Sequence, residues 1–253
     1  MVKLFSALLF LCINFLYCQN FRIYYTFTFK KHPVTQYEVL DHTTAGSAFF
    51  EDKLIHPDNY FKSSFHFQDI YRKRNSDSIT NYLYDNLADI KLKVITYEKI
   101  NWKIFPDTKT VGEYSLQKAE GELGGRKWTA WFSADVPIID GPYKFFGLPG
   151  LIFEVQDSEN IFHYQLVKIE KLPADFGIEP KFRKKTSGAI PATMTDFYKI
   201  WIDFYNDPMK GDKKYLANGG ETDDPGVAMR DIHTKEKDMR RWLQDLYVPI
   251  QKI

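Results

Sequence analysis

Cysteine is scarce in this sequence: 253 residues contain two, Cys12 and Cys18, and both lie near the N-terminus. If the chain is cleaved after Cys18, the remaining protein has no cysteine and cannot form a disulfide. Its fold must then be stabilised by a hydrophobic core. The sequence supplies the material for one, because 17% of its residues are aromatic and a domain of this length can bury them.

The chain also lacks a charge excess and a long apolar run. Lys and Arg number 34 against 33 Asp and Glu, whereas a nucleic-acid partner would require a clustered basic excess. The apolar stretch 4–17 follows Lys3 and is shorter than the roughly 20 residues of a membrane-spanning helix. This pattern is typical of a secretory signal peptide. We therefore interpret residues 1–18 as a signal peptide and 19–253 as one exported domain without a membrane span. An N-terminal anchor helix and lipidation of Cys18 remain as alternatives.

Motifs of established catalytic chemistry are missing as well. The sequence contains no Gly-x-Ser-x-Gly elbow, no phosphate-binding glycine loop and no His-Glu-x-x-His. Its six histidines have no close-spaced pair of the kind that usually binds a metal. We therefore predict no catalytic residues, no metal site and no cofactor. Asp135 and Asp140 could either exchange protons with a substrate or cap turns by accepting backbone N–H bonds, and Glu154 is interpreted as solvated.

The N-terminal two thirds of the chain has the pattern of β-strands. Aromatic and β-branched residues alternate with polar ones from Phe21 to Phe29, which indicates a strand with one apolar face. Gly124-Gly125 favours a tight hairpin turn, because glycine adopts positive φ readily. Residues 62–74 fit either a helix or a strand. Further strands are predicted at 78–84, 91–98, 101–105, 112–122, 126–134, 151–157 and 162–171, with two short ones around Gly46 in 37–52.

The C-terminal third has helical periodicity instead. Two sets of apolar residues recur at spacings of three and four, which places each set on one face of a helix. We predict helices at about 193–207 and 234–248. Strands first and helices last favour a mainly β or α+β fold: a curved, half-barrel-like antiparallel sheet of eight to ten strands, covered by the two C-terminal helices. The two apolar sets are Phe197, Ile200, Trp201, Phe204 and Tyr205, and Met239, Trp242, Leu243, Leu246 and Tyr247.

One segment carries a family resemblance. Trp-Thr-Ala-Trp-Phe at 128–132 is followed by Asp-Gly-Pro-Tyr-Lys-Phe at 140–145 and by Gly-Leu-Pro-Gly-Leu-Ile at 147–152. In this order the strings resemble the GLPGLI family of exported Bacteroidota proteins, over the N-terminal segment and most of the β region but only weakly beyond residue 172. The resemblance implies export and a β-rich fold and supplies no activity. Ser115 departs from it, since many relatives carry cysteine there, so we expect no thiolate chemistry at that position.

The residues 140–150, which we call the corner segment, should form a rigid connection between two strands. Gly141 and Pro142 favour a turn, and Pro149 fixes its own φ while restricting the residue before it to extended backbone. Gly150 then suits the third position of a type II turn, where φ is positive. We predict structural turn roles for these residues and for Gly147.

The aromatic residues of the corner segment either fill one end of the sheet or contact a ligand or partner. Trp128 and Trp131 are an odd number of residues apart, so on a strand they face opposite sides. The candidate contact residues are Trp128, Trp131, Asp140, Tyr143, Phe145, Phe146 and Leu148.

These observations favour a non-catalytic binding or scaffold module, located in the periplasm or at the outer membrane. Its expected partner is an apolar ligand, a peptide or another envelope protein. The alternative is an envelope hydrolase that uses Asp135, Asp140 or His163, for which the only support is that polar residues lie near a rigid turn.

Overall fold

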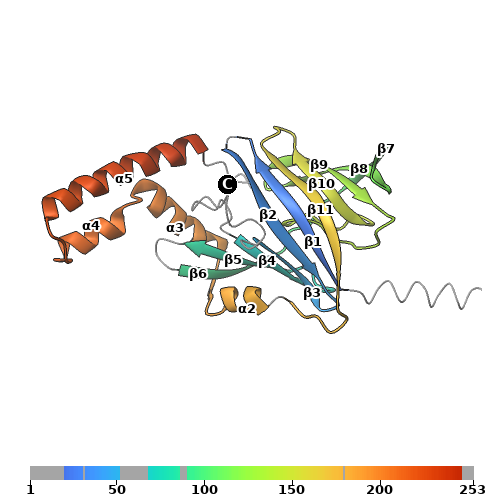
Figure 1. Ribbon diagram of the computed structural model, residues 1–253, viewed down its shortest axis with the longest axis horizontal. Coiled ribbons are helices and arrows are strands. Elements are labelled where there is room, and N and C mark those ends of the chain that lie inside the picture. The colour runs from blue at the N-terminus through green and yellow to red at the C-terminus, as the bar shows by residue number, and fades with distance from the viewer. Residues whose placement is uncertain (1–19, 31, 52–67, 86–89, 179, 247–253) are drawn as a thin grey trace, which may run out of the picture.

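The computed structural model describes residues 20–30, 32–51, 68–85, 90–178 and 180–246 (Figure 1). The predicted signal peptide and the end of the second predicted helix lie outside these residues. Within them, one 12-stranded sheet has the order β12-β6-β5-β4-β3-β2-β1-β11-β10-β9-β8-β7. The strands are β1 Asn20–Phe29, β2 His32–His42, β3 Gly46–Glu51, β4 Gln68–Lys73, β5 Ile79–Asp85, β6 Ile90–Thr96, β7 Lys103–Val111, β8 Tyr114–Leu123, β9 Arg126–Ser133, β10 Leu151–Asp157, β11 Phe162–Leu172 and β12 Ile190–Ala192.

The predicted fold class is confirmed, since an open antiparallel sheet carries helices from the C-terminal part of the chain (Figure 1). The sheet has 12 strands rather than eight to ten. One reason is β4, which forms within the stretch that fitted either a helix or a strand. The predicted boundary of β8 was also wrong: β7 runs to Val111, and Gly112 lies in the turn between the two strands with φ of 60°.

The two faces of the sheet differ in what covers them. On the face that we call inner, Ile23, Tyr25 and Phe27 of β1 are buried in the main core with Trp128 of β9. The connection between β9 and β10, which includes the corner segment, contributes Phe145 to the same core. On the opposite, outer face, Val39 and Phe50 belong to a second cluster with residues from the connection to α2 and from α2 itself. The strand alternation seen in the sequence thus separates two cores.

The helices lie on different parts of the molecule. They are α2 Pro180–Thr186, α3 Met194–Asn206, α4 Lys210–Ala217 and α5 Pro225–Leu246. The seven-residue α2 places Phe182 against the outer face, whereas α3 packs Phe197 and Ile200 against Leu83 of β5 and its neighbours in β6. The register of β4, β5 and β6 assigns those strand residues to the inner face.

Helices α4 and α5 form a hairpin that extends away from the sheet (Figure 1). Thr193 caps α3 as a capping box with Asp196, close to the predicted start of the first helix. The second predicted helix corresponds to α5, which begins at Pro225 rather than near residue 234. None of the helices that the structure describes is both long and apolar enough to cross a membrane.

Candidate functional site

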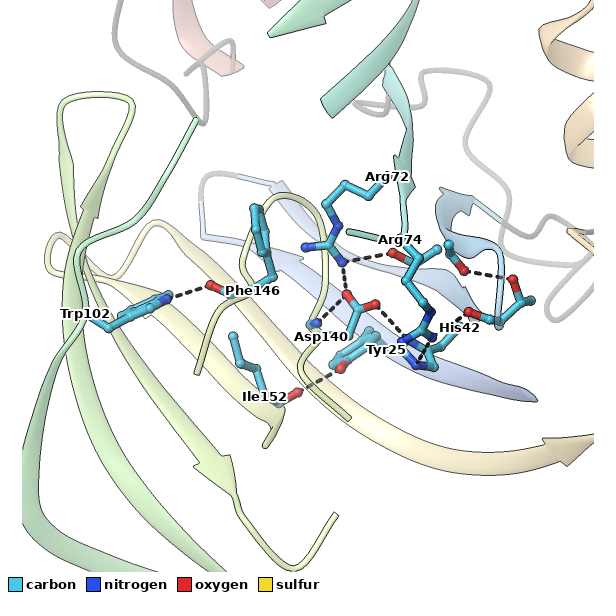
Figure 2. Close-up of polar contacts among 12 residues, drawn as sticks. Tyr25, His42, Arg72, Arg74, Trp102, Asp140, Phe146 and Ile152 are labelled. Atoms are coloured by element: carbon cyan, nitrogen blue, oxygen red, sulfur yellow. Dashed lines mark hydrogen bonds and ion pairs between the residues drawn. The ribbon is translucent and has the colours of Figure 1, made fainter. Parts of the chain in front are cut away.

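The corner segment lies across the inner face and is fixed by side chains from several strands. Lys144, 1% exposed, pairs with Glu98, which follows β6. The indole nitrogen of Trp102 donates a hydrogen bond to the backbone oxygen of Phe146 at 2.8 Å (Figure 2). The hydroxyl of Tyr143 donates to the amide oxygen of Gln68 at 3.2 Å. A segment that is short in sequence is therefore attached to two distant parts of the chain: the connection between β6 and β7, which carries Glu98 and Trp102, and the start of β4.

A further attachment is a charged cluster around Asp140 (Figure 2). The carboxylate accepts a hydrogen bond from Arg72 of β4, and its second oxygen is 2.9 Å from Nδ1 of His42 at the end of β2. The backbone N–H of Gly141 donates to the first oxygen at 2.9 Å. Arg72 also donates to the hydroxyl of Ser47 at 2.9 Å. The cluster ties β2, β3 and β4 to the corner segment.

Arg74 determines which nitrogen of His42 carries a hydrogen. Nη2 of Arg74 is 3.0 Å from Nε2 of His42 (Figure 2), and a guanidinium has only donors, so Nε2 must accept. Nδ1 then carries the hydrogen and donates it to Asp140. Both nitrogens of the imidazole are thereby engaged within the protein, so neither is free to contact a substrate.

The charge on Asp140 is stabilised inside the protein. Burial opposes ionisation of this carboxyl, but the neighbouring Arg72 charge, the hydrogen bond from His42 and the N–H of Gly141 outweigh it and hold the pKa well below 3.8. Asp140 is 2% exposed. A buried carboxylate whose acceptor positions are occupied by protein donors holds the corner in place and cannot reach a substrate.

Asp135 also has a structural role in this connection. One of its carboxylate oxygens accepts a hydrogen bond from the backbone N–H of Ser115 at 3.2 Å and lies 3.3 Å from the hydroxyl of Ser133. The backbone N–H that donates to Asp135 belongs to β8, so the carboxylate links the start of β8 to the segment after β9. Within that segment the hydroxyl of Ser133 accepts a hydrogen bond from the backbone N–H of Asp135.

The backbone of the corner segment does not form the predicted type II turn at Gly150. Gly150 has φ of 159°, not the value near +80° that such a turn requires, so that prediction was wrong. The chain passes so close to β9 at this point that a Cβ on Gly150 would stand 2.0 Å from the carbonyl oxygen of Ser133. Tyr143 adopts φ of 52°, which is unfavourable for a residue with a side chain. The corner is held by its tertiary contacts rather than by one standard turn.

Most of the predicted contact residues are core residues. Tyr143, Phe145 and Leu148 are at most 6% exposed, and Trp128 and Asp140 are equally inaccessible. The ring of Phe145 lies 4.6 Å from that of Trp128, centre to centre. A ligand that arrives from solvent cannot contact these five residues, so the predicted contact role is wrong for such a ligand. They fill the core against the sheet instead, which was the alternative prediction. Trp131 and Phe146 are half-buried, although Phe146 stacks under the guanidinium of Arg72 at 4.0 Å.

Trp131 is part of a polar group on the outer face. The ring lies 4.5 Å from the ammonium of Lys109 on β7, a cation–π contact. Lys109 is also paired with Glu154 of β10, which in turn is 3.0 Å from Nε2 of His163 on β11. Trp131 and Glu154 are paired in register. Four strands therefore bring an aromatic ring, a cation, a carboxylate and an imidazole together where solvent can reach them; we call these four residues the Trp131 group.

Glu154 should titrate at an unusually low pH. The hydrogen bond from His163, opposed by burial and assisted by Lys109, lowers its pKa from 4.5 to about 2. A depressed folded-state pKa contributes stability that is present above 4.5 and lost as the pH falls toward 2. We expect a carbon-13 NMR titration of the Glu154 carboxyl to give a midpoint near 2.

Two variants would check the cause of this shift. Replacing His163 with alanine and replacing Lys109 with methionine should each move the midpoint upward, because each removes a hydrogen bond that lowers the pKa of Glu154. A midpoint that stays at its wild-type value in His163→Ala would contradict the arrangement of the Trp131 group.

Sequence reasoning missed the partners of both arrangements. His42 and Arg72 approach one another only because the register of β2, β3 and β4 pairs His42 with Ser47 and Ser47 with Arg72. Likewise, Glu154 reaches Lys109 across two strands of the sheet. No local spacing contains that information. Among the described residues, no three histidine or carboxylate side chains converge in a way that could hold a metal ion.

Fold and site together define an open antiparallel-sheet protein whose corner segment is held against the sheet by charged and polar side chains from distant parts of the chain. A family described as "Protein of unknown function (Porph_ging)" matches residues 120–154, the stretch from β8 through the corner segment into β10. The matched stretch thus contains the whole corner segment together with β9 and parts of β8 and β10. No curated protein matches this sequence.

Among solved structures, two crystal forms of PNGF-II have a similar fold. Each has a TM-score of 0.55 and covers 72% of this chain, with sequence identities of 15% and 16%. The similar region is 33% of the length of PNGF-II. An uncharacterized conserved protein from Thermus thermophilus has a TM-score of 0.41 at 10% identity, over 74% of this chain and 99% of that one. At 15% and 16% identity, the similarity to PNGF-II concerns the fold alone.

Proposed function

We propose that this chain is an exported bacterial cell-envelope protein that acts as a non-catalytic binding or scaffold module, presented in the periplasm or at the outer membrane. Support for export comes from the basic and apolar N-terminal pattern and from the resemblance to the GLPGLI family. The Porph_ging match lies in the same segment as that resemblance, and the name of that family points to the Bacteroidota.

The proposal that the module is non-catalytic rests on how the side chains of the corner segment are buried and hydrogen-bonded. Asp140, the best-placed candidate for acid–base chemistry, is buried and already accepts hydrogen bonds from Arg72 and Gly141. The inner face holds the protein's own Phe145 and Leu148 in the positions that an apolar ligand would take. These features favour a peptide or a partner protein over an apolar small molecule.

The outer face offers the better surface for such a partner. Trp131 combines an aromatic ring with two charged neighbours, Lys109 and Glu154, which are also paired with each other. Tryptophan is enriched among the residues that dominate the binding energy of protein interfaces. We assign the partner contact to the Trp131 group, and His163 contributes to it by orienting Glu154.

A capture experiment with a matched control tests this function. Tagged wild-type protein, Trp131→Ala and Lys127→Ala would be incubated with envelope and cytoplasmic extracts of a Bacteroidota bacterium, and the captured proteins would be quantified by mass spectrometry. Lys127 is an exposed residue of the same strand. It lies four residues before Trp131, and side chains an even number of residues apart on a strand lie on the same face. We expect one envelope protein to be captured by wild type and by Lys127→Ala, and at least about tenfold less by Trp131→Ala, as for an interface hot spot.

Two outcomes would overturn the proposal. Identical captured sets for all three proteins would remove the role of Trp131. Hydrolysis of an envelope glycan, peptide or lipid ester that is lost in His163→Ala would replace the binding module by the hydrolase alternative.

A further inference from the structure

A second site is formed by the connection between β11 and α2, which crosses the outer face (Figure 1). An open pocket of about 460 Å³ lies there. In the sheet order, β10 and β11 separate β1, beside this pocket, from the strand that carries Trp131. The pocket is thus independent of the surface to which the proposed function is assigned. It is lined by Pro173, Asp175, Phe176, Gly177, Ile178 and Arg183.

The walls of the pocket are fixed before any ligand binds. The side-chain amide of Asn20, 1% exposed, lies 3.0 to 3.1 Å from the backbone oxygens of Pro173, Ala174 and Phe176. Arg22 holds Asp41 through two hydrogen bonds of 2.7 and 2.9 Å, and its guanidinium lies 5.5 Å from the centre of the Phe176 ring. A preformed pocket keeps more of its binding free energy, because little ordering is required on association.

The floor of the pocket is apolar and its rim carries two opposite charges. Ile178 is buried within the outer-face cluster, and Phe176 supplies a ring beside it. Arg183 reaches over Gly177: a Cβ on that glycine would be 3.6 Å from Nη2 of Arg183. In the part of the chain that the structure describes, no carboxylate forms an ion pair with Arg183. Asp175 is the acidic residue of the rim.

We propose that this pocket binds the C-terminal carboxylate of an extended peptide whose last residue is apolar. The planar guanidinium of Arg183 matches a carboxylate with two parallel hydrogen bonds, and the last side chain would lie against Phe176 and Ile178. Asp175 accepts a backbone N–H of the same peptide. This acceptor favours a peptide over a fatty acid, which has a carboxylate and an apolar chain but no N–H donor. The open side of the pocket lets the rest of the peptide leave toward solvent.

Fluorescence anisotropy with three probes tests the proposal. The probes are a labelled pentapeptide ending in leucine with a free carboxylate, the same peptide with an amidated C-terminus, and decanoate as a competitor. We expect the free carboxylate to bind, and amidation or Arg183→Gln to weaken binding at least about tenfold, because each removes a charge-assisted bidentate contact. Asp175→Ala should weaken binding of the peptide, because it removes a hydrogen-bond acceptor for the peptide N–H. The same variant should strengthen binding of decanoate, because it removes a negative charge beside the decanoate carboxylate.

Two matched variants separate this site from its surroundings and from the proposed function. Lys184→Gln changes the charge of the exposed neighbour of Arg183 on α2, and Trp131→Ala removes the centre of the other surface; both should bind the peptide as wild type does. Arg183 is itself exposed, so its substitution should leave the circular dichroism spectrum unchanged. Equal affinity for the free and amidated peptides, an unaltered affinity in Arg183→Gln, or tighter binding of decanoate than of the peptide would overturn the proposal.

Discussion

Replacing Gly150 with alanine is expected to destabilise the protein by about 3 kcal/mol or more, or to prevent folding, since the added methyl group overpacks a rigid contact. The new Cβ would stand 2.0 Å from the carbonyl oxygen of Ser133 and 2.9 Å from the Cα of Ala134. Both are backbone atoms, and Ser133 is also paired in register with Leu151. Neither can move without separating β9 from β10. Urea unfolding followed by tryptophan fluorescence would measure the loss.

Gly147 provides the control within the same segment. It has φ of 93°, but a Cβ there would meet nothing within 4 Å. Alanine at this position should therefore lower the free energy of unfolding only by the penalty of placing a residue with a Cβ at positive φ, about 1 to 2 kcal/mol. A cost for Gly150→Ala that is no larger than that for Gly147→Ala would contradict the close approach of the corner segment to β9.

Local sequence signals were sufficient where the structure depends on neighbours in the chain. The alternation from Phe21 to Phe29 became β1, with its apolar positions facing the main core. Gly124 and Gly125 have φ of 57° and 67°, which is the tight hairpin turn that two adjacent glycines favour. The odd spacing of Trp128 and Trp131 also placed one in the core and the other half-buried. Each of these features is decided within about ten residues.

Local signals failed where a distant segment decides the conformation. The sequence of Leu148, Pro149 and Gly150 fits a type II turn, but the neighbouring strand imposes another backbone path on Gly150. The short α2 has too few residues for a periodic pattern, and it forms where Phe182 packs against Phe50 with ring centres 5.7 Å apart. Such elements depend on packing that a single sequence does not display.

The chemistry of the candidate site was predictable in part. The sequence allowed two roles for Asp140, acid–base chemistry or capping of a turn. The hydrogen bond that it accepts from the backbone N–H of Gly141 is a turn-capping contact. The charged partners could not be found, because His42 and Arg72 are far from Asp140 in sequence and approach it only through strand register. Arg72 would have been a candidate only if the alternation of β4 had been recognised in advance.

Replacing Asp140 with asparagine is expected to cost about 3 to 5 kcal/mol of stability at neutral pH, because the buried charge of Arg72 loses its compensating partner. The expected loss depends on pH. The folded-state pKa of Asp140 lies below 3.8, so its contribution is present above that value and disappears as the pH falls through the folded-state pKa. The stability of wild type should therefore decline in strong acid more steeply than that of Asp140→Asn. Urea midpoints measured from pH 7 down to the acid limit of folding would show the two curves converging.

A double-mutant cycle distinguishes the ion pair from a general effect of changing the corner segment. Arg72→Met should also destabilise the protein, since it leaves Asp140 charged and buried with His42 as its remaining side-chain partner in the cluster. The double variant Arg72→Met/Asp140→Asn should lose less than the sum of the two single losses, because the second substitution removes a charge that the first has left uncompensated. Strictly additive losses, or parallel pH curves for wild type and Asp140→Asn, would show that the charge of Asp140 does not hold the corner segment to β4. The corner segment would then have to be held by its other contacts, among them the packing of Phe145, the close approach at Gly150 and the pairing of Lys144 with Glu98.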